Sequence, residues 1–369
     1  MSAVNNYKFY VMFSELAPLH INKDVGIIPE YLSKRGHETY IFAKNPFPVS
    51  DFQTKIVKAG IFSILKYLRY ERGVKKALFL YFFTLSSKRL LPLIFLKLYN
   101  QEIKIIVKTD GVMHGVIREG DCLIKRMGKR IRAFIFFSLI KLDLTLVENS
   151  GYMRQLLTVS GKLQNRVEVV PNGADEKNYL LSRHKGAYKS IICVGNITFS
   201  KGCDDLLKAF ELIRRKYPQW KVIFIGSLYD DFRETLLKYR SIMGEQLEIQ
   251  GYLGGADLYQ RFVDASIYVL CSKRESWNLA MVEAMASRNA IITSNCGSVA
   301  YITDNGKAGY IYEQSHYEQL SGILDKLMGN SELRRQRQDA AVKRFEEHFQ
   351  WNKIIDDLDL MIMNLYNRR

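Results

Sequence analysis

The sequence has few of the features that mark disordered, disulfide-bonded or membrane-spanning proteins. Only 7 of its 369 residues are proline, and 47% are hydrophobic against 25% charged, so the composition is that of a folded protein. The five cysteines are odd in number, scattered and never spaced as CxxC, so they indicate neither a disulfide framework nor a zinc site. The longest apolar run, "ALFLYFF" at 77–83, is far shorter than the roughly 20 residues of a membrane span.

The N-terminal stretch, "MSAVNNYKFYVMFSELAP", lacks the basic start, apolar core and small-residue cleavage site of a signal peptide. Together with the unpaired pattern of cysteines, this favours a reducing cytoplasm. We therefore expect a cytoplasmic protein.

The chain is too long for one ordinary core, and its pattern predicts two α/β domains. Short β-branched runs alternate with longer helical periods, as in parallel βαβ units. The boundary between the domains is expected near residue 171, where "VVPNGADEKNY" contains turn residues and lacks apolar periodicity. We expect two doubly wound, Rossmann-like domains facing across a cleft, at 1–170 and 171–344, with the amphipathic segment 345–369 packing back on the first.

The net charge of +16 is concentrated in the first half of the chain. Residues 1–170 hold 27 Lys and Arg against 13 Asp and Glu, whereas residues 171–369 hold 27 against 25. Basic and apolar residues alternate at roughly helical spacing in 61–83 and 123–141. Three interpretations of these stretches are open: they are helices that face the core, they bind nucleic acid, or they attach to an anionic membrane. Nucleic acid is the weakest, because no binding module is recognised, and a membrane surface explains both the charge and the apolar content.

Two segments of the second half carry candidate chemistry. In "VGNITFSKGCDDLLKAF", Lys201 stands at a strand-to-helix turn beside a glycine, where a phosphate needs a cation and free helix N–H groups. The Walker pattern is absent, and a surface lysine at a turn is the commoner case.

In "ESWNLAMVEAMA", Glu275 precedes a helix that Asn278 caps, and Glu283 lies within that helix. No Lys or Arg stands four residues before or after Glu283, so ribose hydroxyls are candidate donors to its carboxylate. The N–H of Leu279 and its neighbours would then receive phosphates. The alternative is that one glutamate stabilises the dipole at the start of a helix and the other is an ordinary surface residue without a ligand.

Here the chain resembles the retaining glycosyltransferases of family four, enzymes of GT-B fold that use nucleoside diphosphate sugars. "ESWNLAMVEAMA" resembles their E-x7-E motif, and "KRGHETYIF", "DLTLVENSGYMRQLL", "VVPNGADEKNY", "VIFIGS" and "FQW" follow the family's order. The resemblance implies that Glu283 holds the ribose, Glu275 meets the donor sugar and Lys201 meets the diphosphate. It also implies donor-binding positions at Gly195, Asn196, Gly226, Ser227, Tyr252, Trp277, Asn278 and Leu279.

The chain departs from the family pattern at several positions. Asn196 replaces the usual arginine, and "LHINKDVG" replaces the usual Gly-Gly loop, which places Lys23 as a substitute cation. Thr109 stands for the frequent histidine, leaving Asp110 as the catalytic candidate on the acceptor side, perhaps with His114. Ser287 and Arg288 replace the glycine usual after "EAMA".

The function that the sequence favours is retaining transfer of a sugar from a UDP- or GDP-sugar to a hydroxyl acceptor. The basic first domain indicates a lipid-linked saccharide acceptor in cell-surface polysaccharide synthesis and peripheral attachment to an anionic membrane. The resemblance implies no metal and no other cofactor. A degenerate, non-catalytic nucleotide- or membrane-binding partner is the main alternative. An epimerase on the same fold is a third, and it would need acid and base residues that are not apparent.

Overall fold

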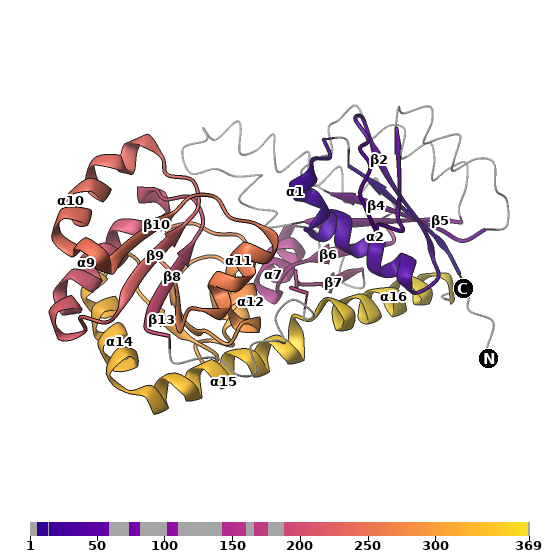
Figure 1. The fold of residues 1–369 in the computed structure, drawn as a ribbon. Coiled ribbons are helices and arrows are strands. Elements are labelled where there is room, and N and C mark those ends of the chain that lie inside the picture. Colours follow the sequence, from indigo (N-terminus) through magenta and orange to yellow (C-terminus); the bar gives the residue numbers. More distant parts are fainter. Residues whose placement is uncertain are drawn as a thin grey trace, which may run out of the picture. The chain divides into compact units, whose positions relative to one another are not determined.

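The computed structural model describes residues 6–13, 15–58, 74–81, 102–109, 142–159, 166–175 and 188–367. It divides into two units, residues 1–171 with 352–369, and residues 172–351 (Figure 1). No helix within the described ranges is both long and apolar enough to cross a membrane.

The first unit is built on a parallel seven-stranded sheet in the order β3-β2-β1-β4-β5-β6-β7. The strands are β1 (Lys8–Met12), β2 (Glu38–Ala43), β3 (Lys55–Lys58), β4 (Lys76–Tyr81), β5 (Ile103–Thr109), β6 (Leu144–Val147) and β7 (Val167–Val169). Its described helices are α1 (Pro18–Ile21), α2 (Asp24–Lys34), α7 (Ser150–Val159) and the terminal α16 (Trp351–Asn367).

The second unit has a parallel six-stranded sheet in the order β10-β9-β8-β11-β12-β13. Its strands are β8 (Ser190–Val194), β9 (Lys221–Ile225), β10 (Leu247–Gln250), β11 (Ile267–Leu270), β12 (Ala290–Ser294) and β13 (Tyr310–Tyr312). Its helices are α9 (Cys203–Ile213), α10 (Arg233–Met243), α11 (Gly255–Val263), α12 (Leu279–Ala286), α13 (Val299–Ile302), α14 (Tyr317–Gly329) and α15 (Ser331–His348).

Helices cover both faces of the second sheet, as the sequence predicts for a doubly wound domain. One hydrophobic cluster joins α9, α10 and α14 to one face, and another joins α11, α12 and α15 to the other (Figure 1). The expectation of two Rossmann-like domains is confirmed. Such a sheet binds ligands beyond the carboxyl ends of its strands, where the strand order reverses.

The helical interpretation of residues 61–83 is wrong for its last part. Residues 76–81 form β4, which lies between β1 and β5 in the middle of the sheet, and Lys76 is fully buried. A parallel strand with both faces covered is a continuous apolar run and has no alternation to separate it from a buried helix. The short edge strands β3 and β13 are further strands that the sequence pattern did not reveal. Residues 61–73, 82–83 and 123–141 lie outside the described residues.

The C-terminal helix α16 is fastened to the first unit by a small polar cluster. The Tyr7 hydroxyl donates to Asp359 Oδ1 at 2.8 Å, and His37 Nε2 lies 3.1 Å from Asp359 Oδ2. The rings of Tyr7 and His37 are stacked with centroids 3.9 Å apart. Burial raises the pKa of the Asp359 carboxyl, but these hydrogen bonds outweigh burial and leave its pKa below the ordinary value. Residues 345–351 of the expected returning segment lie in the second unit.

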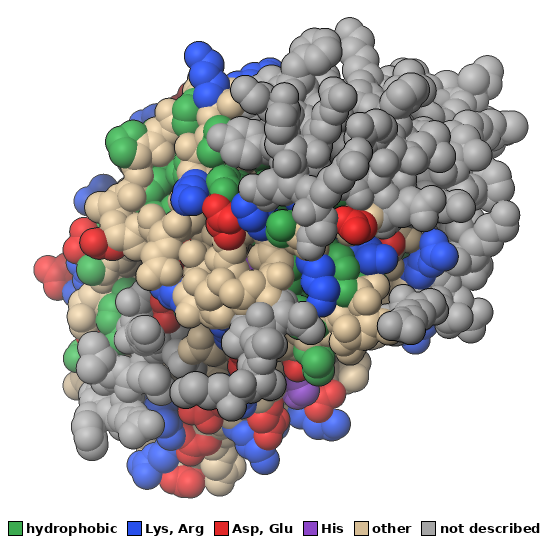
Figure 2. All heavy atoms as spheres, turned by 90° about the vertical axis from the view of Figure 1, so that its right-hand side faces the viewer, with side chains coloured by type: hydrophobic (Ala, Val, Ile, Leu, Met, Phe, Trp, Pro, Cys, Tyr) green, Lys and Arg blue, Asp and Glu red, His purple; other side chains and the backbone are tan. Residues whose placement is uncertain are grey.

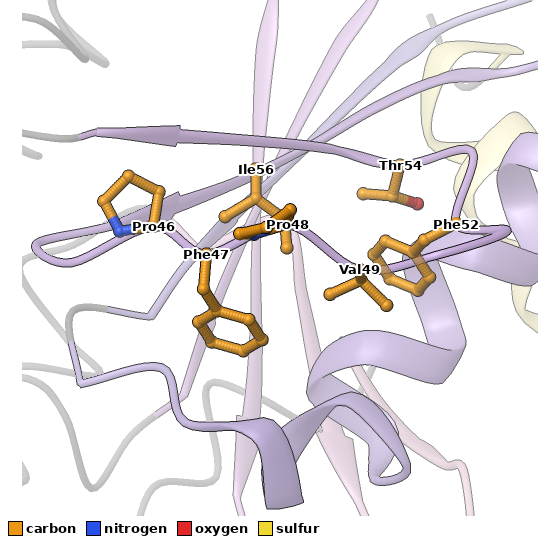
Figure 3. Close-up of a pocket in the computed structure, with 7 residues that line it drawn as sticks. All are labelled: Pro46, Phe47, Pro48, Val49, Phe52, Thr54 and Ile56. Carbon is orange, nitrogen blue, oxygen red and sulfur yellow. The ribbon is translucent and has the colours of Figure 1, made fainter.

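The connection between β2 and β3 forms a hollow of about 280 Å³ on the first unit, lined mostly by residues of apolar type. Residues 44–54 contain no helix, and the Glu30 carboxylate on α2 accepts hydrogen bonds from the backbone N–H groups of Gln53 and Thr54. Figure 3 shows the side chains that line the hollow, which are Pro46, Phe47, Pro48, Val49, Phe52, Thr54 and Ile56.

Candidate donor-binding site

The candidate site lies at the carboxyl edge of the second sheet. Strands β8 and β11 are neighbours there, with β9 and β10 on one side and β12 and β13 on the other. Chain order therefore reverses between β8 and β11, which is the switch point at which doubly wound sheets bind ligands. The loop after β8 (residues 195–202) carries Lys201, and the loop after β11 (residues 271–278, the site loop) carries Glu275.

Two predicted glycines allow the backbone to pass very close at this edge. Gly195 and Gly226 have φ of 140° and 143°, values that favour glycine. A Cβ atom on Gly226 would lie 2.0 Å from the Gly195 carbonyl oxygen. The Ser227 carbonyl accepts a hydrogen bond from the Ile197 N–H at 2.9 Å. Exposed Asn196 donates from Nδ2 to the Tyr229 hydroxyl at 3.4 Å, and its contact with a donor stays a prediction.

Lys201 is held by a short turn that packs against the site loop. Thr198 caps this turn by accepting from the Lys201 N–H at 3.2 Å. Gly202 follows with φ of 63°, and a Cβ atom there would lie 2.1 Å from the Cys271 carbonyl oxygen. Only glycine allows the two loops to approach so closely.

Lys201 and Glu275 form an ion pair across the two loops. Lys201 Nζ lies 2.6 Å from Glu275 Oε2, with 33% and 15% of the two side chains exposed. The pair joins the predicted diphosphate cation to the predicted sugar-binding carboxylate. A ligand phosphate at this place would therefore compete with Glu275 for the lysine.

Helix α12 begins directly after the site loop, and Asn278 is its N-cap as predicted. Asn278 Oδ1 accepts from the Met281 N–H at 2.7 Å and from the Tyr268 hydroxyl at 3.0 Å. The N–H groups of the first turn, including that of Leu279, have no carbonyl within the helix to bind. They form an electropositive end beside the ion pair.

Both predicted carboxylates lie near one buried phenol, that of Tyr268. Its pKa is raised far above the ordinary value by burial first, then by the Cys193 thiol and by the negative charges of Glu275 and Glu283. Glu283 lies on α12, which begins four residues after Glu275. Tyr268 remains protonated and donates to Asn278. The sequence contains no signal that singles out Tyr268, since a tyrosine in an apolar strand is normally a core residue.

The segment after β12 supports the site loop and was not selected from the sequence either. Gly297 has φ of 53°, and a Cβ atom on it would lie 1.7 Å from the Glu275 carbonyl oxygen. The neighbouring Ser298 hydroxyl donates to the Ser276 carbonyl. The "NCG" sequence at 295–297 is a turn signal, but it does not reveal which backbone the turn meets.

Two aromatic residues of the prediction lie in opposite environments. Trp277 is buried, with 7% of its surface exposed, and it packs on Tyr301 and Phe349. Tyr252, in the loop after β10, is 77% exposed. Direct donor contact by either side chain stays a prediction.

The remaining predicted residues belong to the first unit. Lys23 is the exposed N-cap residue of α2, and the adjacent Asp24 pairs with buried Lys108 at 3.1 Å. Thr109 ends β5, while Asp110 and His114 lie outside the described residues. Their roles stay predictions.

No group of three or more His, Cys, Asp or Glu side chains is placed to hold a metal ion within the part of the chain that the structure describes. Four cysteines in that part are free and buried. Burial raises the pKa of the Cys271 and Cys296 thiols, so these are packing residues with little thiolate character.

Comparison with known proteins gives one family match and several relatives. Residues 181–344 match the family model described as "Glycosyl transferases group 1". An uncharacterized glycosyltransferase of Haemophilus influenzae is 27% identical over 86% of this chain and 83% of its own length. The capsular polysaccharide biosynthesis glycosyltransferase CapM of Staphylococcus aureus is 24% identical over 46% of this chain and 44% of its own length.

Solved structures resemble the chain over nearly its whole length. A glycosyltransferase from Rickettsia africae ESF-5 has a TM-score of 0.76 at 13% identity, covering 99% of this chain and 100% of that one. HepE of Anabaena, solved with UDP and glucose, has a TM-score of 0.71 at 11% identity and covers 97% and 100%. At these identities the likeness establishes the fold.

Proposed function

Because the chain is a glycosyltransferase of group 1 with the GT-B fold, we propose that it transfers a sugar from a UDP- or GDP-sugar to a saccharide hydroxyl with retention. The observation that carries this proposal is the Lys201–Glu275 pair, whose glutamate lies in the loop that leads directly into the N-terminus of α12. A cation, free N–H groups and two carboxylates within one region suit a diphosphate flanked by two sugars.

In this proposal each group of the site has one task. Lys201 and the first N–H groups of α12 stabilise the negative charge that grows on the leaving diphosphate. Glu283 accepts hydrogen bonds from the ribose, and Glu275 accepts them from the transferred sugar. The leaving phosphate takes the acceptor's proton as the new bond forms on the same face, which requires no enzymic nucleophile. Asp110 remains the acceptor-side candidate. No metal has a task, because the lysine and the amides supply the positive charge.

The nucleotide class is supported by HepE, whose structure contains UDP and glucose. Exposed Tyr252 and the loop that holds Ser227 are the groups we assign to the base. The first test is a binding screen with UDP, GDP and their common sugars. Binding of neither nucleotide would refute the donor class.

Point substitutions then test the two carboxylates separately. Glu283→Ala should raise the donor KM strongly, because ribose contact stabilises ground state and transition state alike. Glu275→Gln should mainly lower kcat, because its sugar contact lies nearer the reacting carbon. Wild-type kinetics in both variants would show that the site is wrongly assigned.

We further propose that the acceptor is a lipid-linked saccharide of cell-surface polysaccharide synthesis, bound at the cytoplasmic face of an anionic membrane. The name of the Staphylococcus aureus relative and the excess of basic residues in 1–170 support this, and the hollow between β2 and β3 offers Phe47 and Phe52 for contact with lipid. Basic and acidic side chains are mixed on the described surface that faces the viewer in Figure 2. The basic and apolar stretches 61–83 and 123–141 lie mostly outside the described residues.

Flotation with liposomes tests the membrane proposal. Binding should need anionic lipid and weaken with salt, because each surface Lys or Arg contributes about 1 kcal/mol. Phe47→Asp in the hollow should reduce binding, whereas Leu237→Asp, at an exposed apolar position of the second unit, should not. Salt-insensitive binding, or equal effects of the two variants, would contradict the proposal.

A further inference from the structure

The three residues of the site loop that follow Arg274 are each supported by one short segment, residues 297–301. Gly297 packs against the Glu275 carbonyl, and the Ser298 hydroxyl donates to the next carbonyl, that of Ser276. The Tyr301 ring then meets the Trp277 ring, with centroids 6.1 Å apart. The position of Glu275 is therefore determined by the packing beneath the loop.

Trp277 extends this support to the end of α15. Its ring meets the Phe349 ring edge to face, with centroids 5.8 Å apart, and Phe349 lies 6.4 Å from the Tyr301 ring. The Arg344 guanidinium lies over Tyr301 and Phe349 at 5.7 and 5.4 Å, and its Nη2 donates to the Tyr301 carbonyl at 2.9 Å. Edge-to-face rings capped by a cation form a packing unit with a preferred geometry.

Phe349 also lies where two connecting segments of the chain meet. We call these segments, which run between the two units, the crossings. The chain passes from one unit to the other after residue 171 and again after residue 351. The Phe349 carbonyl accepts from the Ala174 N–H at 3.0 Å, and Ala174 forms a parallel β-bridge with Gln350. One residue thus contacts the site loop through its ring and holds both crossings through its backbone.

We propose that Phe349 is a positioning residue of the donor site, which acts by holding Trp277 and, through it, Glu275 and the start of α12. This inference rests on the donor site proposed above.

The test compares Phe349→Leu with Phe345→Leu in the full-length chain. Both phenylalanines are buried and lie one helical turn apart, so the two substitutions remove similar apolar volume from one core. No ring contact joins Phe345 to Trp277 in the described structure. Two properties are measured: amide hydrogen exchange in peptides that cover the site loop, residues 271–278, and the affinities for UDP and GDP, with thermal melting as the control for folding.

Phe349→Leu should speed exchange in the site loop and weaken binding of the preferred nucleotide by about 2- to 30-fold, the range for residues that couple sites at a distance. Phe345→Leu should lower the melting temperature comparably and change neither property. Equal effects of the two variants would reduce Phe349 to core packing, and unchanged loop exchange in Phe349→Leu would overturn the inference. If the wild-type chain bound neither nucleotide, the donor proposal would fail, and loop exchange would still decide the role of Phe349.

Discussion

Replacing Glu275 by glutamine should tighten the binding of UDP or GDP and at the same time slow sugar transfer. Lys201 Nζ lies 2.6 Å from Glu275 Oε2. A diphosphate must therefore draw the lysine away from its partner, against the repulsion of a neighbouring carboxylate. Glutamine removes both obstacles. A free nucleotide carries no sugar, so it does not lose the contact that Glu275 is proposed to make in catalysis.

The size of the effect follows from the exposure of the pair. With 33% of Lys201 and 15% of Glu275 exposed, the pair resembles surface pairs, which contribute about 0.2–1 kcal/mol. Release of Lys201 should then tighten nucleotide binding by up to about fivefold, since about 1.4 kcal/mol is tenfold. Lys201→Met should instead lose a charge-assisted hydrogen bond of about 1.5–3 kcal/mol, which weakens binding by about 10- to 150-fold.

Calorimetric titration of the two single variants and the double variant with UDP and with GDP, at fixed ionic strength, measures these terms. In the Lys201→Met background the benefit of Glu275→Gln should shrink, because no lysine remains to be released. If Glu275→Gln weakened binding of the free nucleotide, or if its benefit were unchanged in that background, the competition between ligand and carboxylate for Lys201 would be refuted.

Three further substitutions test the support of the site, the docking of α16 and the proposed second cation. Gly297→Ala should lower kcat, because its Cβ would meet a site-loop carbonyl at 1.7 Å; a wild-type rate would contradict that role. Asp359→Asn should lower the free energy of unfolding by about 1 kcal/mol, which corresponds to about 2–4 °C of melting temperature at pH 7. Asp357→Asn, at an exposed neighbouring position, should leave the melting temperature almost unchanged. Since the Asp359 pKa is lowered, its contribution is present above the unfolded pKa and is lost as pH falls through the folded pKa, so the difference in calorimetric melting should vanish in acid. Lys23→Ala should lower kcat with little loss of nucleotide affinity, and Asn196→Arg should partly restore it; an unchanged rate would leave Lys23 an ordinary surface lysine.

Much of the second unit could be predicted from local sequence. The strand cores at 190–194, 221–225 and 267–270 are bounded by glycine or polar residues, and Asn278 is a cap by residue type. These features depend on neighbours in the chain, so a short window contains the information. The sequence of β4 does not contain this information, because burial on both faces of the strand removes the alternation of polar and apolar residues that identifies a strand.

The sequence by itself determined the two α/β domains, the turn that carries Lys201 and the helix start after Glu275. Only the tertiary structure decided that these two side chains pair, although they are 74 positions apart. The reason is the strand order: β9 and β10 lie on the far side of β8, so β11 packs beside β8 and brings its loop to the lysine. The packing of Gly297 and Phe349 beneath that loop has the same origin, since no local pattern specifies which distant backbone or ring a residue will meet.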